Sequence, residues 1–370
     1  MGLVHNGGPD WGSGADANLA DPAVQANPRD APPMAGNSTE ILTLLAGLAG
    51  GLILGWVALR ANFCVMGGIT DILLMDDGRR FRAWLLAIAI AVLGTEGLSL
   101  LGLIRLEGAP YLSPSFGWLA AAVGGVLFGF GMTLAGGCVQ RSLVRLGAGS
   151  PKALLVIAMV ALFAWLTAQG PLAPLRQFLT GFANVLATSP SQDMASLLAP
   201  FLGMSAFILR AGLALLLGVL LLWICLGNAN FRASPRDLGA GAAFGLAVCF
   251  GWFVTSQTGA VPGSFNFVMP FGEFTPSFSA AGALGLVLGA FLSVAFPWRV
   301  RVEWFADVTD AVHHAAGGAL MGIGGTLALG CTIGQGATGV STLAFGSLVA
   351  WAAMIGGAVL GLRYLEAREA

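Results

Sequence analysis

The sequence predicts an all-α polytopic membrane protein with about nine transmembrane helices arranged as two inverted repeats. Three observations predict this fold. Of the 370 residues, 56% are hydrophobic and only 9% are charged, whereas about a quarter of the residues of an ordinary soluble domain are charged. Apolar runs near the roughly 20 residues that cross hydrocarbon recur along the chain. A cysteine inside a glycine-rich break also occurs twice, at matching places of two halves.

Continuous apolar runs locate the membrane-spanning helices, since a transmembrane β-barrel would show short alternating segments instead. The expected helices cover 41–61, 83–104, 117–134, 151–169, 205–226, 238–258, 279–298, 313–329 and 340–362. Residues 1–38 are rich in Pro, Gly, Asn and Asp, so we expect a disordered tail. A single transmembrane domain follows over 39–370. It divides into repeat one at about 40–170, a connecting region at about 171–230 and repeat two at about 231–362.

Basic residues cluster in alternate connections and after the last helix, at 79–82, 141–152, 232–236, 299–301 and 363–368. By the positive-inside rule these segments face the cytoplasm. The N-terminus is then expected outside the cell and the C-terminus in the cytoplasm. An odd number of helices precedes the second half, so the two halves are expected to have opposite orientations. A net charge of −1 gives no reason to expect nucleic-acid binding.

The two matching breaks have the sequences GGVLFGFGMTLAGGCVQR, at 124–141, and GGALMGIGGTLALGCTIGQGATG, at 317–339. Aligning Cys138 with Cys331 pairs most of their glycines at a constant offset of 193 residues. Glycine-rich backbone persists at membrane depth only where it is buried in protein or lines a cavity. We therefore expect re-entrant loops or short half-helices that meet near the midplane. Their N–H groups and helix N-termini would favour an anion.

These breaks supply the candidate site residues. A buried cysteine is commonly a small packing residue, but the recurrence of Cys138 and Cys331 in a duplicated break favours a functional role. Cys64 lies in a third broken element and is a further candidate, whereas Cys225 and Cys249 lie in plain apolar helices and are interpreted as packing. The expected substrate pathway comprises the three candidate cysteines and their neighbours, namely Cys64, Gly67, Gly68, Gly136, Gly137, Cys138, Gln140, Gly330, Cys331, Thr332 and Gln335.

A few ionisable residues are candidates for other roles. Arg141 could attract an anion to the inner mouth or could serve only to set the topology. Glu96 is the one acid well inside a predicted span, so it is either a proton site or, if that helix is shorter, an interfacial residue. His313 and His314 are interpreted as interfacial rather than as a metal or proton site. The five cysteines form no CxxC pair, so neither a local metal site nor a cofactor is expected.

The motifs Asn62-Phe63-Cys64, LAGGC at 134–138 and LALGCTIGQG at 327–336 resemble those of the YeeE/YedE family of bacterial inner-membrane proteins. The resemblance covers about residues 40–362. It implies an inverted-repeat helical fold and uptake of thiosulfate, which three cysteines hand inward through transient S–H···S contacts. Carried over to this chain, these are Cys64, Cys138 and Cys331. The chain departs from the family pattern at two places. Gln140-Arg141 is bulkier than expected after the first Gly-Cys, and Leu329 stands where a glycine is expected.

The expected function is therefore transport rather than catalysis. The family includes members tied to selenium metabolism, so another sulfur or selenium compound stays open, and a cytoplasmic sulfur carrier or sulfurtransferase is a candidate partner. One alternative is a membrane thiol protein that transfers sulfane sulfur through a persulfide on Cys331, but no CxxC or nearby histidine base activates that thiol. A soft-metal transporter is a third class, poorly matched by isolated cysteines.

Overall fold

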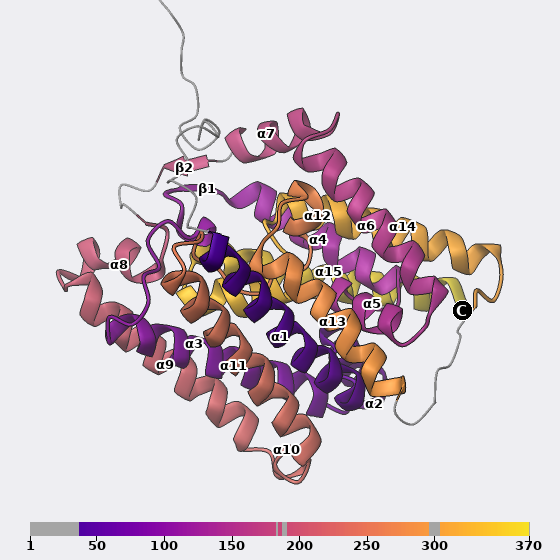
Figure 1. Cartoon of the computed structure of the whole chain (residues 1–370), viewed down its shortest axis with the longest axis horizontal. Helices are drawn as coiled ribbons and strands as arrows, with labels where there is room; N and C mark the ends of the chain where they lie inside the picture. Colours follow the sequence, from indigo (N-terminus) through magenta and orange to yellow (C-terminus); the bar gives the residue numbers. More distant parts are fainter. Residues whose placement is uncertain (1–36, 183, 187–190, 296–303, 370) are drawn as a thin grey trace, which may run out of the picture. The chain divides into compact units, whose positions relative to one another are not determined.

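The computed structural model describes residues 37–182, 184–186, 191–295 and 304–369, which are almost entirely helical (Figure 1). The tail expected over 1–38 lies outside these residues except for its last two. The α-helices are α1 (Asn37–Ala61), α2 (Val65–Met75), α3 (Arg79–Leu100), α4 (Trp118–Leu134), α5 (Val139–Gly147), α6 (Pro151–Ala168), α7 (Ala173–Phe182), α8 (Met194–Leu202), α9 (Ala206–Leu226), α10 (Ala229–Arg232), α11 (Pro235–Gln257), α12 (Met269–Glu273), α13 (Phe278–Ala295), α14 (Val308–Leu327) and α15 (Phe345–Glu369).

The remaining elements are short. They are the 3-10 helices η1 (Pro110–Leu112) and η3 (Val340–Thr342), the π-helix η2 (Gly334–Gly339), and the strands β1 (Ser115–Gly117) and β2 (Asn184–Leu186). The two strands pair antiparallel, with Phe116 opposite Val185. They join the connection after α3 to the region between the two repeats, where α7 and α8 are the short helices (Figure 1).

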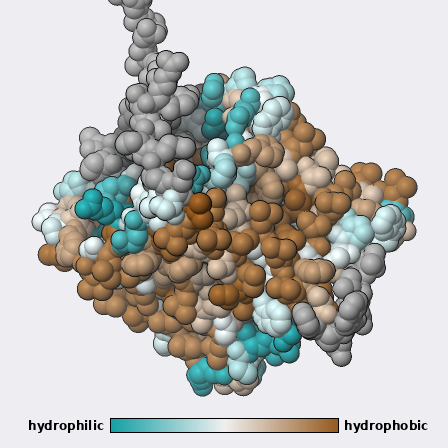
Figure 2. All heavy atoms as spheres, in the orientation of Figure 1, coloured by the Kyte–Doolittle hydropathy of each residue, from teal (hydrophilic) through white to brown (hydrophobic). Residues whose placement is uncertain are grey.

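Within the described ranges, eight helical segments are long and apolar enough to cross a membrane. They correspond to eight of the nine expected helices. The ninth, expected at 313–329, is present as α14, whose first half carries Asp310, His313 and His314. Figure 2 shows hydrophobic residues across the middle of the visible face, over α1 and α11, and hydrophilic residues around α10 at its lower end. This is a multi-pass membrane protein.

Helices of the two halves pack in reciprocal pairs. By sequence order, α1, α3, α4 and α6 of the first half correspond to α11, α13, α14 and α15 of the second. α1 packs on α13 while α11 packs on α3, and α4 packs on α15 while α14 packs on α6. If the two halves are exchanged, the α1–α13 pair becomes the α11–α3 pair, and the α4–α15 pair becomes the α14–α6 pair. A twofold relation between two repeats produces this pattern, so the packing is consistent with the expected inverted repeat.

Glycines allow α4 and α14 to cross closely. A Cβ on Gly124 would lie 2.6 Å from the carbonyl oxygen of Gly324, and one on Gly131 would lie 2.7 Å from that of Gly317. Gly124 and Gly317 are counterparts at the 193-residue offset, as are Gly131 and Gly324. The repeat therefore relates the contact between Gly124 and Gly324 to the contact between Gly317 and Gly131. Small residues let backbones approach in this way, so these glycines hold the two halves together near the candidate site.

Candidate functional site

Each of the three candidate cysteines lies at the start of a short helix. Cys64 precedes α2, Cys138 precedes α5, and Cys331 precedes the helical stretch 332–342 that contains η2 and η3. All three are buried, with exposed fractions of 6%, 1% and 0%. Helix N-termini carry unpaired N–H groups and the positive end of the helix dipole. The expected half-helices are therefore present, and their arrangement favours a bound anion near each thiol.

The chain reaches Cys138 through a turn that ends α4. Gly137 donates its N–H to the carbonyl of Met132 at 2.8 Å, and Gly136 has a positive φ of 65°. This is a Schellman turn, in which a left-handed glycine ends the helix because a Cβ is penalised there. The turn redirects the chain so that α5 begins directly after Cys138.

The same turn precedes Cys331 at the end of α14. Gly330 donates its N–H to the carbonyl of Gly325 at 2.7 Å, and Leu329 takes the left-handed conformation with a φ of 58°. Leu329 is the counterpart of Gly136 at the 193-residue offset. The leucine at which this chain departs from the family pattern thus keeps the backbone conformation that glycine adopts in the other half.

Backbone donors surround the sulfur of Cys331. Its Sγ accepts hydrogen bonds from the N–H groups of Phe267 and Gly334, both at 3.4 Å. Gln335 is 3% exposed, and its amide donates to the carbonyl of Ala328, in the turn before the cysteine. Phe267 belongs to the connection between α11 and α12. This connection and the helical stretch 332–342 therefore both donate hydrogen bonds to the Cys331 thiol.

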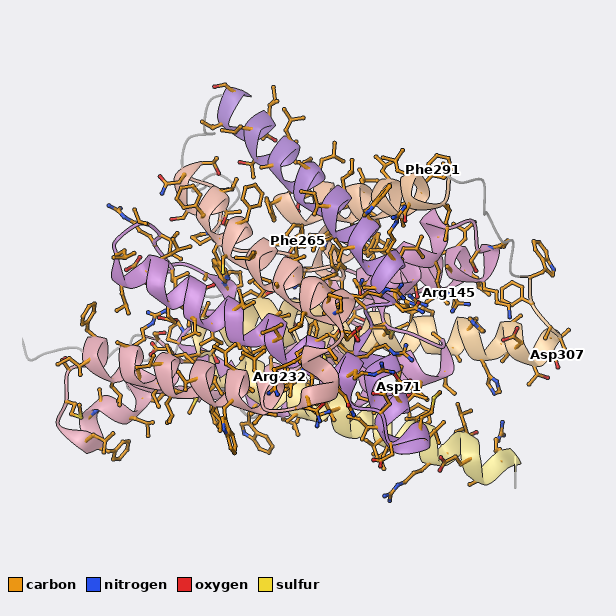
Figure 3. All side chains as sticks on the ribbon, turned by 90° about the horizontal axis from the view of Figure 1, so that it is seen from below. Asp71, Arg145, Arg232, Phe265, Phe291 and Asp307 are labelled. Atoms are coloured by element: carbon orange, nitrogen blue, oxygen red, sulfur yellow. The ribbon has the colours of Figure 1, made fainter. Side chains whose placement is uncertain are left out.

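Asn266 ties the same connection to the turn before Cys331. Its side-chain amide donates to the carbonyl of Leu329 and to the hydroxyl of Tyr111, both at 3.1 Å. Burial raises the pKa of the Tyr111 phenol, which therefore stays neutral and able to donate. Phe265 of this connection is fully buried among the helices (Figure 3). The surroundings of Cys331 thus consist of neutral polar groups.

Cys64 and Cys138 lie beside each other, although they come from different elements. Their thiols are close enough to interact, and the Thr332 side chain lies beside Cys138. The Sγ atom of Cys138 lies 3.9 Å from Oε1 of Gln140, which is 1% exposed. Thr332 directly follows Cys331. The start of the helical stretch 332–342 therefore lies beside Cys64 and Cys138.

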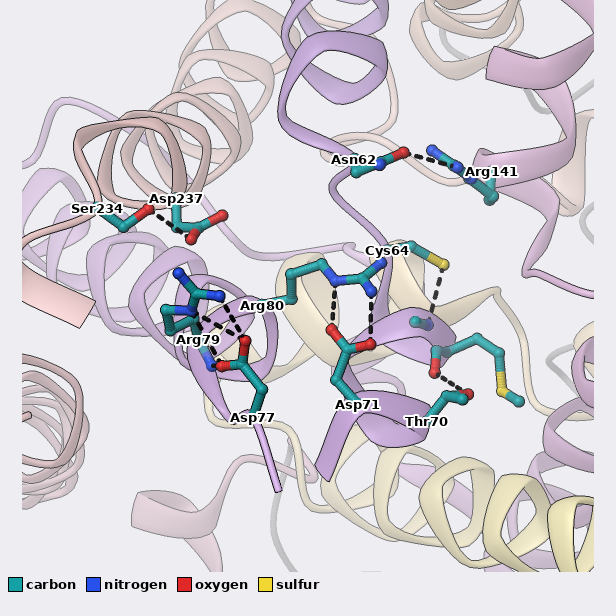
Figure 4. Close-up of polar contacts among 12 residues, drawn as sticks. Asn62, Cys64, Thr70, Asp71, Asp77, Arg79, Arg80, Arg141, Ser234 and Asp237 are labelled. Atoms are coloured by element: carbon teal, nitrogen blue, oxygen red, sulfur yellow. Dashed lines mark hydrogen bonds and ion pairs between the residues drawn. The ribbon is translucent and has the colours of Figure 1, made fainter. Parts of the chain in front are cut away.

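Charged residues lie on the side of Cys64 that faces α3. The N–H of Gly67 donates to Cys64 Sγ at 3.4 Å, and a Cβ on Gly67 would lie 2.7 Å from Nη1 of Arg80. Arg80 forms an ion pair with Asp71 of α2 (Figure 4). Gly68 has a different role, since it packs against Phe81 of α3. The first turn of α2 therefore places a guanidinium close to one thiol.

Arg141 lies on the other side of the thiol pair. It donates from Nη2 to Oδ1 of Asn62 at 2.8 Å (Figure 4). Its charge acts directly on the thiol of Cys64. Its Nη1 atom is buried and has no hydrogen-bond partner within the described part of the chain. Arg141, proposed from the sequence as an anion attractor, thus adjoins Cys64 and Cys138.

Glu96 lies apart from the cysteines. Its carboxylate is 1% exposed and accepts two hydrogen bonds from Arg210, at 2.6 Å from Nε and 3.0 Å from Nη2. Because α3 ends at Leu100 and not at 104, Glu96 lies one turn from the end of its helix, and its position relative to the membrane interface stays a prediction. A bidentate ion pair thus fastens α9 to α3.

The other cysteines donate to backbone carbonyls of α3. Cys225 lies 3.3 Å from the carbonyl oxygen of Arg82, and Cys249 lies 3.6 Å from that of Ile90. These contacts fit their interpretation as packing residues. Near the start of α14, His314 lies 2.9 Å from a carboxylate oxygen of Asp310. Among the described residues, no group of three His, Cys, Asp or Glu side chains gathers as a metal site.

Sequence reasoning did not assign a role in this site to several of its residues. Asn62 and Asn266 carry a readable signal, because each is a polar residue next to apolar ones in a connection between helices. Phe267 gives none, since it contributes a backbone N–H that every residue except proline has. The other residues that only the structure brings to the site are Tyr111 and Arg80.

Comparison with known proteins identifies the family of this chain. The family model described as sulphur transport matches residues 60–360. The thiosulfate transporter TsuA of Escherichia coli (strain K12) is 27% identical over 348 residues, which cover 85% of this chain and 90% of that protein. The thiosulfate transporter TsuA of Spirochaeta thermophila is 26% identical over 317 residues, which cover 82% of this chain and 93% of that protein. The match includes all three cysteine breaks, and this chain belongs to the sulphur transport family.

Proposed function

We propose that this protein takes up thiosulfate across a bacterial inner membrane, with its N-terminus in the periplasm and its C-terminus in the cytoplasm. The observation that carries the proposal is the convergence of Cys64, Cys138 and Cys331, three buried thiols that each begin a short helix. The substrate named for the two similar transporters supports this proposal. The basic connections support this orientation.

The direction of transfer follows from the neighbours of each thiol. Cys331 lies beside Tyr111 and Asn266, from connections that carry few basic residues and are assigned to the periplasm. Cys64 lies close to Arg80 and Arg141, from connections assigned to the cytoplasm. Thiosulfate would therefore meet Cys331 first, then Cys138 and Cys64. The cationic inner end would draw a dianion inward.

The chemistry of thiosulfate suits these groups. Its soft terminal sulfur can accept a hydrogen bond from a neutral thiol, whereas a thiolate would repel the dianion. The N–H groups at the three helix N-termini offset the remaining negative charge. We propose that no covalent bond forms, because conduction requires contacts that are easily released. A cytoplasmic sulfur carrier or sulfurtransferase would then receive the substrate.

Uptake of radiolabelled thiosulfate into liposomes holding the purified protein tests the proposal. Wild-type protein should accumulate label, while Cys138→Ala and Cys331→Ala should each lose uptake with insertion unchanged. Cys249→Ala is the matched control, since this buried thiol lies outside the site and should keep uptake close to wild type. Normal uptake by both site variants would contradict the proposed pathway.

Two further measurements define the substrate and the mode of transfer. Unlabelled thiosulfate should compete with the label more strongly than sulfite, sulfate or selenite. A stronger effect of selenite would reassign the substrate to a selenium compound. Mass spectrometry of protein recovered after uptake should show unmodified cysteines. A persistent sulfur adduct on Cys331 would instead support the persulfide mechanism.

A further inference from the structure

Two tryptophans near the thiols carry buried donors that the protein does not use. Trp84 of α3 is 1% exposed, and Trp351 lies on α15. The indole Nε1 atoms of both are buried, and neither has a hydrogen-bond partner within the described ranges. Buried polar groups are nearly always partnered, so an unpaired one needs an explanation. An indole N–H can only donate, and the missing partner must therefore be an acceptor.

The two indoles meet over Gly336 of η2. A Cβ added to Gly336 would lie 2.6 Å from Cδ1 and 2.9 Å from Nε1 of Trp351, and 3.0 Å from Cζ2 of Trp84. Cζ2 is two bonds from the indole nitrogen of Trp84, so both N–H groups lie near one point. A side chain at Gly336 would collide with both rings, so glycine at this position is what allows the two indoles to approach η2 here.

This point adjoins the three cysteines. Gly336 belongs to the helical stretch that Cys331 precedes, one turn after Thr332, whose side chain lies beside Cys138. Trp84 packs against Phe63, the residue before Cys64, with ring centroids 5.7 Å apart. The unpaired donors thus belong to the wall of the proposed pathway and not to a separate part of the molecule.

We propose that Trp84, Trp351 and Gly336 form an oxyanion cradle, in which the two indole N–H groups bind the oxygen end of the transported sulfur anion. The inference rests on the proposed function and adds a second set of contacts through which the protein recognises its substrate. The thiols contact the soft terminal sulfur, whereas the cradle contacts the hard sulfonate oxygens. Indoles do not ionise, so they hold an oxyanion without adding a positive charge that would trap it.

Trp84→Phe and Trp351→Phe test the cradle, because each keeps a six-membered aromatic ring and removes the pyrrole ring with its N–H, as the control variant below also does. In the liposome assay, each variant should raise the KM for thiosulfate roughly tenfold, the loss expected for one hydrogen bond to a charged group. Trp252→Phe is the matched control, since its buried indole already donates to Ser341 Oγ at 3.0 Å. A KM within twofold of wild type for both cradle variants would overturn the proposal.

A binding measurement keeps the inference testable if a variant transports poorly. Wild-type protein in detergent should be stabilised against heat by thiosulfate, and by sulfate at higher concentration, because sulfate has the oxygens but no soft sulfur. The Trp84→Phe and Trp351→Phe variants should lose the sulfate effect. If wild type takes up no thiosulfate, the proposed function fails, whereas the anion-induced shift still decides the cradle. A sulfate shift that both variants retain would refute the cradle.

Discussion

The breaks at Cys138 and Cys331 share a backbone but differ in what surrounds the sulfur. Both end a long helix in the same left-handed turn and start a short helix. Cys331 accepts two peptide N–H groups, whereas Cys138 lies beside a second thiol near a guanidinium. The repeat therefore determines the path of the chain, and the segments packed against each break determine its chemistry. Under the proposed function, the two halves would provide the two ends of the pathway.

Replacing each thiol by a hydroxyl should have the largest effect and should separate the two ends. Cys331→Ser should mainly raise the KM for thiosulfate, since this residue meets the substrate first, by about ten- to a hundredfold. Cys138→Ser should mainly lower the maximal rate, because it interrupts transfer after binding. Initial uptake rates over a range of concentrations measure both. Identical changes in KM for the two variants would contradict distinct roles.

Removing the polar support of the Cys331 end should have the next largest effect. Asn266→Ala breaks the bonds to Leu329 and Tyr111 and leaves buried partners unpaired, so the KM should rise about tenfold. Asn266→Gln offers a partial rescue in the same uptake assay. The Cys64 end should be undisturbed, so maleimide labelling of Cys64 in permeabilised liposomes should match wild type. A change in that labelling would show that the two ends are not independent.

Removing charge at the Cys64 end should have a smaller effect that depends on salt. Arg141→Gln keeps a donor for Asn62 but loses the positive charge, so uptake should fall a few-fold at low ionic strength and less in about 1 M salt, which screens the attraction. Uptake rates at the two salt concentrations measure this. A salt-independent loss would indicate a structural role, as would an equal loss in Arg363→Gln, a control located at the far end of α15.

The smallest effects should come from the left-handed residues before the two cysteines. Gly136→Leu introduces a Cβ where φ is 65° and should destabilise the protein by about 1–2 kcal/mol. Leu329→Gly removes the same strain at φ 58°, offset in part by the greater entropy of an unfolded glycine, so its stability should stay within about 1 kcal/mol of wild type. Thermal unfolding in detergent measures both. A larger loss for Leu329→Gly would mean that the leucine side chain itself supports the site.

Much of the fold could be predicted from the sequence because apolar length and glycine breaks are local signals. The helix expected at 151–169 is α6 (Pro151–Ala168), and the one expected at 205–226 is α9 (Ala206–Leu226). The short helices after the cysteines also follow from the breaks. By contrast, the Glu96–Arg210 pair joins residues 114 positions apart, and nothing local specifies that partner. The adjacency of Cys64 and Cys138 could not be predicted for the same reason, because no local signal in the sequence pairs them.

The reciprocal pairing of α1 with α13, α3 with α11, α4 with α15 and α6 with α14 limits how the protein can move. Each of these pairs joins one repeat to the other, so the halves are interleaved and do not form two separate bodies. A rocking motion of one half against the other would break all four pairs together. Transport then requires a nearly stationary frame, with movement confined to side chains and short helices at the three cysteines. For the same reason, a half synthesised alone would lack the helix partners against which its glycines pack.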